Sequence, residues 1–83
     1  MEVEDMAYRN NDFHFEIVEQ IGVIAERTSG WKLEINRMSW NDKPAKYDIR
    51  EWDEKHDRMG RGTTLTEDEA RTLYEILKAR FEA

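Results

Sequence analysis

Two tryptophans and several cations gather in the middle of the chain, around its only proline. Trp40 and Trp52 lie in the segment SWNDKPAKYDIREW, which spans residues 39–52. Aromatic rings stack on unpaired nucleobases and cationic side chains bind phosphates, so this combination is typical of single-stranded nucleic-acid binding. Tryptophan and arginine are also frequent hot spots of protein–protein interfaces.

Patterns for catalysis or metal binding are weaker. His14 and His56 are the only histidines, and His56 lies in the segment DEKHD at residues 53–57. Carboxylates flank this histidine, but no second histidine is near it in sequence, so a solvated loop is the better interpretation. The chain has no glycine-rich phosphate loop and no serine or cysteine nucleophile motif. We therefore expect no enzyme activity, no metal or cofactor and no small-molecule substrate.

The distribution of charged residues also indicates that a binding site lies in the middle of the chain. The 83 residues include 13 basic and 19 acidic side chains, for a net charge of −6. That total argues against a phosphate-binding surface. Residues 21–50, however, carry six basic and four acidic residues and are the net basic part of the sequence. Because the local field decides where a phosphate binds, this middle part is the candidate site.

The hydrophobic pattern predicts an α+β domain of four antiparallel strands followed by one helix (ββββα). Apolar residues alternate from Phe13, and a break in phase at residues 19–22 indicates a bulge or bend. Turn-rich segments separate the strands that follow. These further strands are predicted at residues 31–40, 46–52 and 60–65.

The C-terminal helix is predicted from Thr66 onward. Thr66 and Glu69 have the spacing of a capping box. Ile76 lies about 60° outside the apolar stripe of this helix, at about 100° per residue. A helix that packs only on its own sheet does not need Ile76, so a second surface such as a partner helix is expected. The stripe consists of Ala70, Leu73, Tyr74, Leu77 and Phe81.

The small size of the chain also favours self-association. A domain of this length buries only about 60% of its unfolded surface, and the absence of cysteine excludes disulfides. We expect a single domain at residues 12–83 after a loose acidic arm at residues 1–11. No segment has the pattern of a membrane span or signal peptide, so a cytoplasmic protein is expected. The residues expected at a homodimer interface are Leu73, Ile76, Leu77 and Phe81.

Alternation with a period of two divides the strand residues between two faces of the sheet. One helix cannot cover both faces, and an antiparallel sheet can leave one face in water. We expect the helix to cover the face that carries Trp31, Leu33, Ile35, Tyr47 and Ile49. The other face, which we expect to be exposed, carries Lys32, Glu34, Asn36, Met38, Trp40, Lys46, Asp48, Arg50 and Trp52.

Two interpretations of the exposed face remain open. Tryptophans at strand ends are often edges of the core, and the cations alternate with carboxylates, so cross-strand ion pairs also account for them. Exposed pairs contribute only about 0–1 kcal/mol. In the other interpretation, bases stack on the tryptophans at about 1–3 kcal/mol each, while cations bind the phosphates.

The segment YDIREW at residues 47–52, followed after a polar turn by GRGTTLT at residues 60–66 and an acidic helix start, resembles the positive cofactor four family of transcriptional coactivators. That family has an Asp-Ile-Arg-Glu strand, then a strand with glycines around basic residues, then its helix. Residues 29–46 resemble the small bacterial YdbC-like branch in particular. The resemblance covers roughly residues 13–82.

The resemblance implies a homodimer of curved four-stranded sheets joined largely through their helices. It implies that single-stranded DNA lies across the sheets with little sequence preference. Transcription, replication and repair all expose such strands. The long basic or serine-rich tail of the eukaryotic coactivator has no counterpart, so a coactivator role is not expected. By this resemblance, DNA contacts fall on Trp40, Lys43, Lys46, Arg50, Trp52 and Arg61, with Gly62 allowing close backbone approach.

Trp40 and Trp52 are thus the candidates for base stacking. Arg37 is the weakest candidate for a phosphate contact, because its parity places it with Leu33 and Ile35 and a twisted strand would have to turn it outward. The full set of phosphate candidates is Lys32, Arg37, Lys43, Lys46, Arg50 and Arg61.

Two alternatives to single-stranded DNA binding stay open. A stacking platform accepts the bases of RNA as well as DNA, so single-stranded RNA is the first. The second is a protein-interaction module, in which a peptide strand adds to an exposed edge of the sheet.

Overall fold

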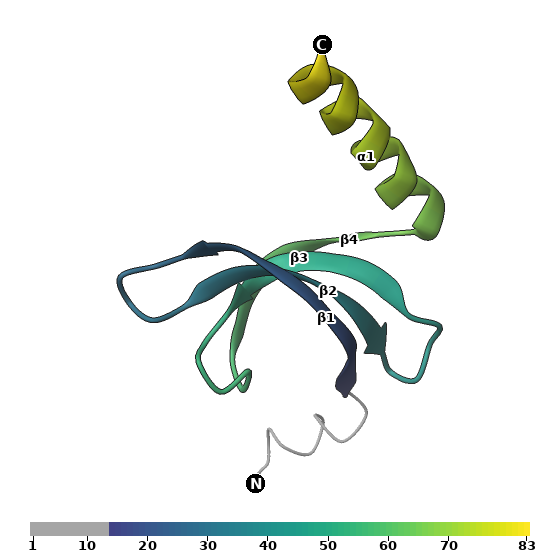
Figure 1. Cartoon of the computed structure of the whole chain (residues 1–83). Coiled ribbons are helices and arrows are strands. Elements are labelled where there is room, and N and C mark those ends of the chain that lie inside the picture. The colour runs from purple at the N-terminus through teal and green to yellow at the C-terminus, as the bar shows by residue number, and fades with distance from the viewer. Residues whose placement is uncertain (1–13) are drawn as a thin grey trace, which may run out of the picture.

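The computed structural model describes residues 14–83, which form a four-stranded antiparallel sheet followed by one helix (Figure 1). The strands pair in chain order, so β1 and β4 are the edges of the sheet. The predicted ββββα order is confirmed, whereas Phe13 and the expected arm at residues 1–11 lie outside the described residues. The elements are β1 (Phe15–Glu26), β2 (Lys32–Trp40), β3 (Lys46–Trp52), β4 (Met59–Leu65) and α1 (Glu67–Glu82).

Strand β1 is irregular, as its broken alternation predicted. It has 12 residues, and each bulge in such a strand adds bend and twist. Figure 1 shows the result, a sheet that curls into an arch below α1. The register with β2 shifts between Ile17 and Glu19, between Gln20 and Gly22, and between Val23 and Ala25.

Five residues, 41–45, connect β2 to β3, and this connection begins with a tight turn at Asn41 and Asp42. Asn41 and Asp42 have φ of 52° and 65°, and the amide of Lys43 donates to the carbonyl of Trp40 at 3.0 Å. Asparagine and aspartate tolerate this left-handed conformation, and such turns match the twist of paired strands. Asn41 also exchanges two hydrogen bonds with the backbone of His14, each of 2.8 Å, which ties the turn to the start of β1.

Helix α1 has the predicted capping box. The hydroxyl of Thr66 accepts from the amide of Glu69 at 3.1 Å, and the carboxylate of Glu69 accepts from the amide of Thr66 at 2.8 Å. No residue of α1 is buried, and Figure 1 shows the helix extending away from the sheet. Within residues 14–83, no helix is long and apolar enough to cross a membrane.

Helix α1 begins on the convex side of the arch, next to Ile35 and Tyr47. The prediction that it covers this face is wrong, because the helix extends away from the sheet and has no buried residue. A groove of about 390 Å³ is lined by Ile21, Ile35 and Tyr47 from the sheet and by Ala70 and Tyr74 from α1, among others. The opposite, concave face was expected to be exposed, and this expectation is wrong at its centre. The buried residues on the concave face are Glu34, Asn36, Met38, Asp48 and Trp52.

Curvature explains why the concave face is buried. The curled sheet brings side chains of its two ends over the middle strands, so this face makes its own core instead of depending on α1. Phe15 of β1 lies 5.4 Å from Trp52, ring centre to ring centre, and His56 lies 5.5 Å from it on the loop before β4. A flat sheet with the same alternation would leave these residues in water.

Candidate nucleic-acid interface

Trp52 is fully buried, and its predicted exposure is therefore wrong. Its ring is covered by Phe15 and His56, at tilts of 49° and 41°. The indole Nε1 of Trp52 has no hydrogen-bond partner among the described residues. Strand parity correctly indicated the face on which Trp52 lies, but it gave no information on what covers that face. We leave Trp52 out of the candidate stacking residues.

Trp40 remains a stacking candidate because it is only partly buried. It is the last residue of β2, directly before the turn that carries Lys43. Phe15 packs at one side with ring centres 5.9 Å apart. The guanidinium carbon of Arg50 lies 4.7 Å from the centre of the Trp40 ring, within the range of a cation–π interaction. Phe15 and Arg50 thus both contact the Trp40 ring at the end of β2.

Arg50 and Asp48 form a tight ion pair on β3. Nε of Arg50 donates to Oδ1 of Asp48 at 2.6 Å, and Nη2 donates to Oδ2 at 2.7 Å. Thr64 of the neighbouring strand donates to the same Oδ2 at 3.1 Å. The Arg50 side chain is 14% exposed and the Asp48 side chain 0%. Sequence analysis considered cross-strand ion pairs, whereas this bidentate pair joins two residues of the same strand.

Gly62 lies opposite Arg50 in the register of β3 and β4. A Cβ at this position would clash with Cβ of Arg50 and would lie 2.8 Å from its Nε. The family resemblance assigned the space over Gly62 to an approaching nucleic-acid backbone. In the structure, the side chain of Arg50 fills that space.

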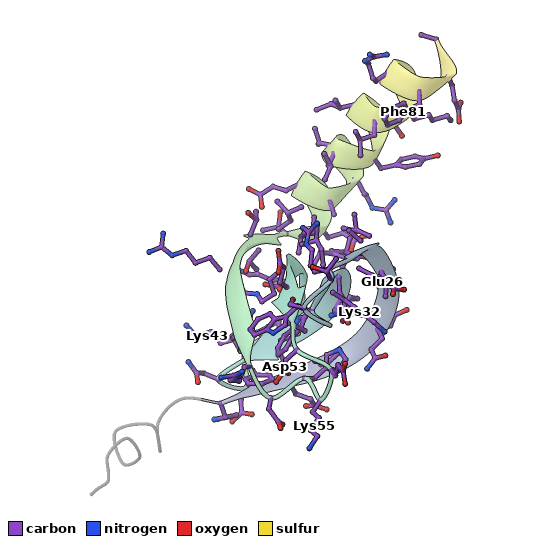
Figure 2. The ribbon with its side chains drawn as sticks, turned by 90° about the vertical axis from the view of Figure 1, so that its left-hand side faces the viewer. Glu26, Lys32, Lys43, Asp53, Lys55 and Phe81 are labelled. Atoms are coloured by element: carbon purple, nitrogen blue, oxygen red, sulfur yellow. The ribbon has the colours of Figure 1, made fainter. Side chains whose placement is uncertain are left out.

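Four of the residues predicted to contact phosphate form no ion pair with any other described residue. Lys43, Lys46 and Arg61 are exposed, while Lys32 is half-buried. Lys43 and Lys46 flank Trp40, whereas Lys32 lies at the other end of β2, and Figure 2 shows Lys32 and Lys43 well apart. The unpaired cations are Lys32, Lys43, Lys46 and Arg61.

Arg37 does not belong to this set. Its guanidinium carbon lies 5.8 Å from the centre of the Tyr47 ring, on the side of the sheet that faces α1. Its parity with Ile35 predicted this position, and no twist turns it to the concave face. We leave Arg37 out of the candidate interface.

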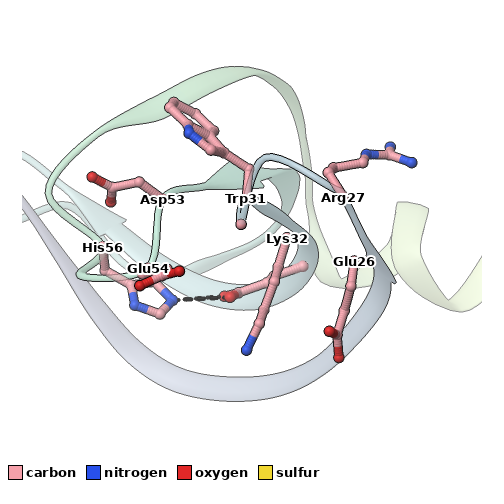
Figure 3. A pocket seen from close by; sticks show the side chains of 9 residues that line it. Glu26, Arg27, Trp31, Lys32, Asp53, Glu54 and His56 are labelled. Carbon is pink, nitrogen blue, oxygen red and sulfur yellow. Dashed lines mark hydrogen bonds and ion pairs between the residues drawn. The ribbon is translucent and has the colours of Figure 1, made fainter.

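A pocket of about 340 Å³ lies at the end of the concave face away from Trp40 (Figure 3). Within it, Nε2 of His56 is 3.0 Å from each carboxylate oxygen of Glu34, and Asn36 donates to the same carboxylate at 3.0 Å. Sequence analysis missed this contact because His56 and Glu34 are 22 residues apart. Three further acidic side chains line the pocket, those of Glu26, Asp53 and Glu54. Their negative charge disfavours a phosphate there.

Asp53 holds the loop that carries His56. Its Oδ1 accepts from the amides of Asp57 and Arg58 at 2.8 and 3.1 Å. The hydrogen bond from the Arg58 backbone is the largest effect that lowers the pKa of Asp53 below its ordinary value, and it outweighs the opposing effect of desolvation. His56 has φ of 60°, so this loop holds it in a conformation that non-glycine residues rarely adopt. The DEKHD segment is thus an ordered turn. In residues 14–83 no group of three or more His, Cys, Asp or Glu could hold a metal ion.

The residues predicted at a dimer interface are accessible in the single chain. Ile76 and Phe81 are 59% and 76% exposed, and Leu77 is exposed as well, while Leu73 is half-buried. Tyr74 of the same helix is also exposed. Strand β1 adds further large apolar side chains that sequence analysis did not single out, namely Val18, Ile21, Val23 and Ile24.

The sequence of this chain is similar to a protein-family model and to a bacterial protein. Residues 28–76 match the family model described as Transcriptional Coactivator p15 (PC4). An uncharacterized protein of Treponema pallidum (strain Nichols) is 41% identical over 70 residues, which cover 84% of this chain and 82% of that protein. The matched segment contains β2, β3, β4 and the first part of α1, and hence Trp40 and the unpaired cations.

Proposed function

The chain belongs to the Transcriptional Coactivator p15 (PC4) family, and from this premise we propose that it is a non-enzymatic protein that binds single-stranded DNA as a homodimer. The family is associated with single-stranded DNA binding and coactivation. We propose sequence-tolerant binding, because stacking on an aromatic ring accepts any base. Its targets are strands exposed in transcription, replication or repair in the cytoplasm.

The observation that carries this proposal is the partly exposed Trp40 with unpaired cations beside it. Lys43 follows it in the turn, and Lys46 lies on β3 opposite Met38, two residues before Trp40. A base stacked on the indole would have its phosphates within the field of both lysines. Arg61 adds a further exposed cation on β4, whereas Lys32 lines the acidic pocket at the far end of β2.

The homodimer is supported by apolar surface that the single chain leaves in water. Helix α1 has no buried residue, and Ile76, Leu77 and Phe81 are exposed along it. Exposed patches of this kind mark interaction sites in soluble proteins. A second copy offers the same apolar helix and β1, so a two-fold contact buries both at once.

A fluorescence titration tests the proposed function. The protein is titrated with oligo-dT, oligo-U and a blunt duplex at two salt concentrations. We expect oligo-dT to quench tryptophan emission, with weaker binding at higher salt and little response to the duplex. Trp40→Phe removes most of the quenching, whereas the matched variant Trp31→Phe, which alters a tryptophan outside the interface, retains it.

The other outcomes of this titration distinguish single-stranded DNA binding from RNA binding and from peptide binding. An equal response to oligo-U extends the ligand to single-stranded RNA. No response to any oligonucleotide contradicts the proposal and favours a peptide-binding module that uses the edges of the sheet. Quenching that persists in Trp40→Phe contradicts the assignment of Trp40 even if the protein binds DNA.

A further inference from the structure

The guanidinium of Arg50 is already occupied within the chain. Nε and Nη2 donate to the two oxygens of Asp48, and Nη1 donates to the carbonyl of Gly60 at 3.3 Å and approaches Sδ of Met59 at 3.5 Å. An arginine side chain has five N–H groups, so few donors remain for a ligand. A phosphate that binds Arg50 would have to displace one of these contacts.

The charge of Arg50 is also balanced. Asp48 is fully buried, and within residues 14–83 its carboxylate pairs with the Arg50 guanidinium and accepts a hydrogen bond from the Thr64 hydroxyl. Release of the guanidinium to a phosphate would leave a buried carboxylate without its counter-charge, which is strongly unfavourable. The pair as a whole is neutral, so it adds little to the attraction of the concave face for phosphates.

The structural setting fixes the guanidinium against Trp40. Asp48 pairs with Thr64 and Arg50 with Gly62 across β3 and β4, and the missing Cβ of Gly62 leaves the room in which the Arg50 side chain lies. The guanidinium carbon is 4.7 Å from the centre of the Trp40 ring. The fork geometry of the ion pair thus determines where one side of the indole rests.

We propose that Arg50 is a positioning residue, which holds the indole of Trp40 in place for base stacking and does not bind phosphate. This inference rests on the proposed function and reassigns the arginine to which the family resemblance gave a DNA contact. Phosphate contacts then fall on the unpaired cations, among them Lys46 and Arg61.

The salt dependence of oligo-dT binding distinguishes the two roles. Each phosphate contact contributes about 0.7 to the slope of log K against log salt for a single strand. The test variant is Asp48→Asn/Arg50→Met, which removes both charges and leaves no carboxylate unpaired. We expect it to bind on the order of tenfold more weakly at every salt concentration, with the wild-type slope. Lys46→Ala, the matched control, flattens the slope by about 0.7.

A double-mutant cycle tests whether Arg50 acts through Trp40. Addition of Trp40→Ala to the test variant is expected to cause no further loss beyond that of Trp40→Ala alone, because both changes remove the same stacking interaction. Arg50→Lys keeps the charge but lacks the fork, so it is expected to bind as weakly as the test variant. Additive losses, or wild-type affinity in Arg50→Lys, overturn the proposal.

Two controls make the result unambiguous. Circular dichroism and denaturant unfolding establish that each variant is folded before its affinity is measured. If the wild-type protein binds and the test variant flattens the slope as Lys46→Ala does, the positioning role is wrong while the proposed function stands. If the wild-type protein shows no response to oligo-dT, both proposals fail.

Discussion

At the scale of single residues, the concave face depends on positions where an additional atom has no room. Gly62 is such a position, because a Cβ there would clash with Cβ of Arg50 and with the carbonyl oxygen of Ile49. Gly22 on β1 has open space around it, and a Cβ there would meet no atom within 4 Å. The two glycines therefore differ in what they tolerate, although both lie in strands.

We predict that Gly62→Ala destabilises the protein by about 1–3 kcal/mol, as extra atoms in packed regions do. Gly22→Ala, the matched control, is expected to be neutral or to stabilise by up to about 1 kcal/mol, since it only restricts the unfolded chain. Denaturant unfolding at one fixed protein concentration measures both. Equal free energies of unfolding for the two variants would show that Arg50 does not need the space above Gly62.

At the scale of elements, the stability of α1 depends on interactions within the helix more than that of a helix in a packed core does. None of its residues is buried, so little tertiary packing within the chain supports it. The capping box of Thr66 and Glu69 is therefore a large part of its local stability, together with the acidic first turn. The Arg71–Glu67 pair at 2.9 Å adds a few tenths of a kcal/mol at most.

Loss of the cap tests this account of α1. Thr66→Ala is expected to destabilise the protein by about 1 kcal/mol and to lower its helical circular dichroism signal. Thr72→Ala, which changes the same residue type inside α1, is expected to be neutral or slightly stabilising because alanine is the better helix former. A Thr66→Ala variant as stable as Thr72→Ala would mean that contacts outside the chain, not the cap, fix the start of α1.

At the scale of the whole molecule, the single chain buries the middle of the concave side of its sheet and leaves apolar side chains of β1 and α1 exposed. Val18, Val23 and Ile24 of β1 are about half exposed, as is Ile76 of α1. Burial of such a side chain contributes about 1.5–3 kcal/mol. A two-fold contact between copies gains this energy from both chains.

We predict that the protein has twice its chain mass of 10.0 kDa in solution and that Ile76→Asp shifts it to the mass of one chain. The loss of one buried isoleucine from each copy raises the dimer dissociation constant by about 100-fold or more. Ile76 is not buried in the single chain, so the protomer is expected to stay folded. Analytical ultracentrifugation measures both states.

Ala79→Asp is the matched control, since it adds the same carboxylate on the side of α1 away from the apolar stripe. We expect it to remain a dimer. A monomeric wild-type protein at concentrations well above the micromolar range would contradict the proposed homodimer. Dissociation of both variants alike would indicate a general effect of charge on α1.

Local patterns in the sequence determined the secondary structure. Alternating apolar residues predicted the first three strands and the irregularity of β1, and the segment GRGTTL predicted the fourth strand. The Thr66–Glu69 spacing predicted the helix start. These predictions are confirmed. These features depend on contacts between residues close in sequence, or on a simple period of two or 3.6. The family resemblance also came from short segments, and the family match over residues 28–76 confirms it.

Only the tertiary structure decided which side of the sheet is buried. A period of two separates two faces, but curvature decides which face closes on itself, and three register shifts in β1 set that curvature here. Trp52 is therefore buried beneath Phe15 and His56, and Arg50 is paired with Asp48 above Gly62. The contacts of Trp52 with Phe15 and His56, and of Arg50 with Gly62, join residues from separate strands and loops, and their spacing along the chain carries no signal of them.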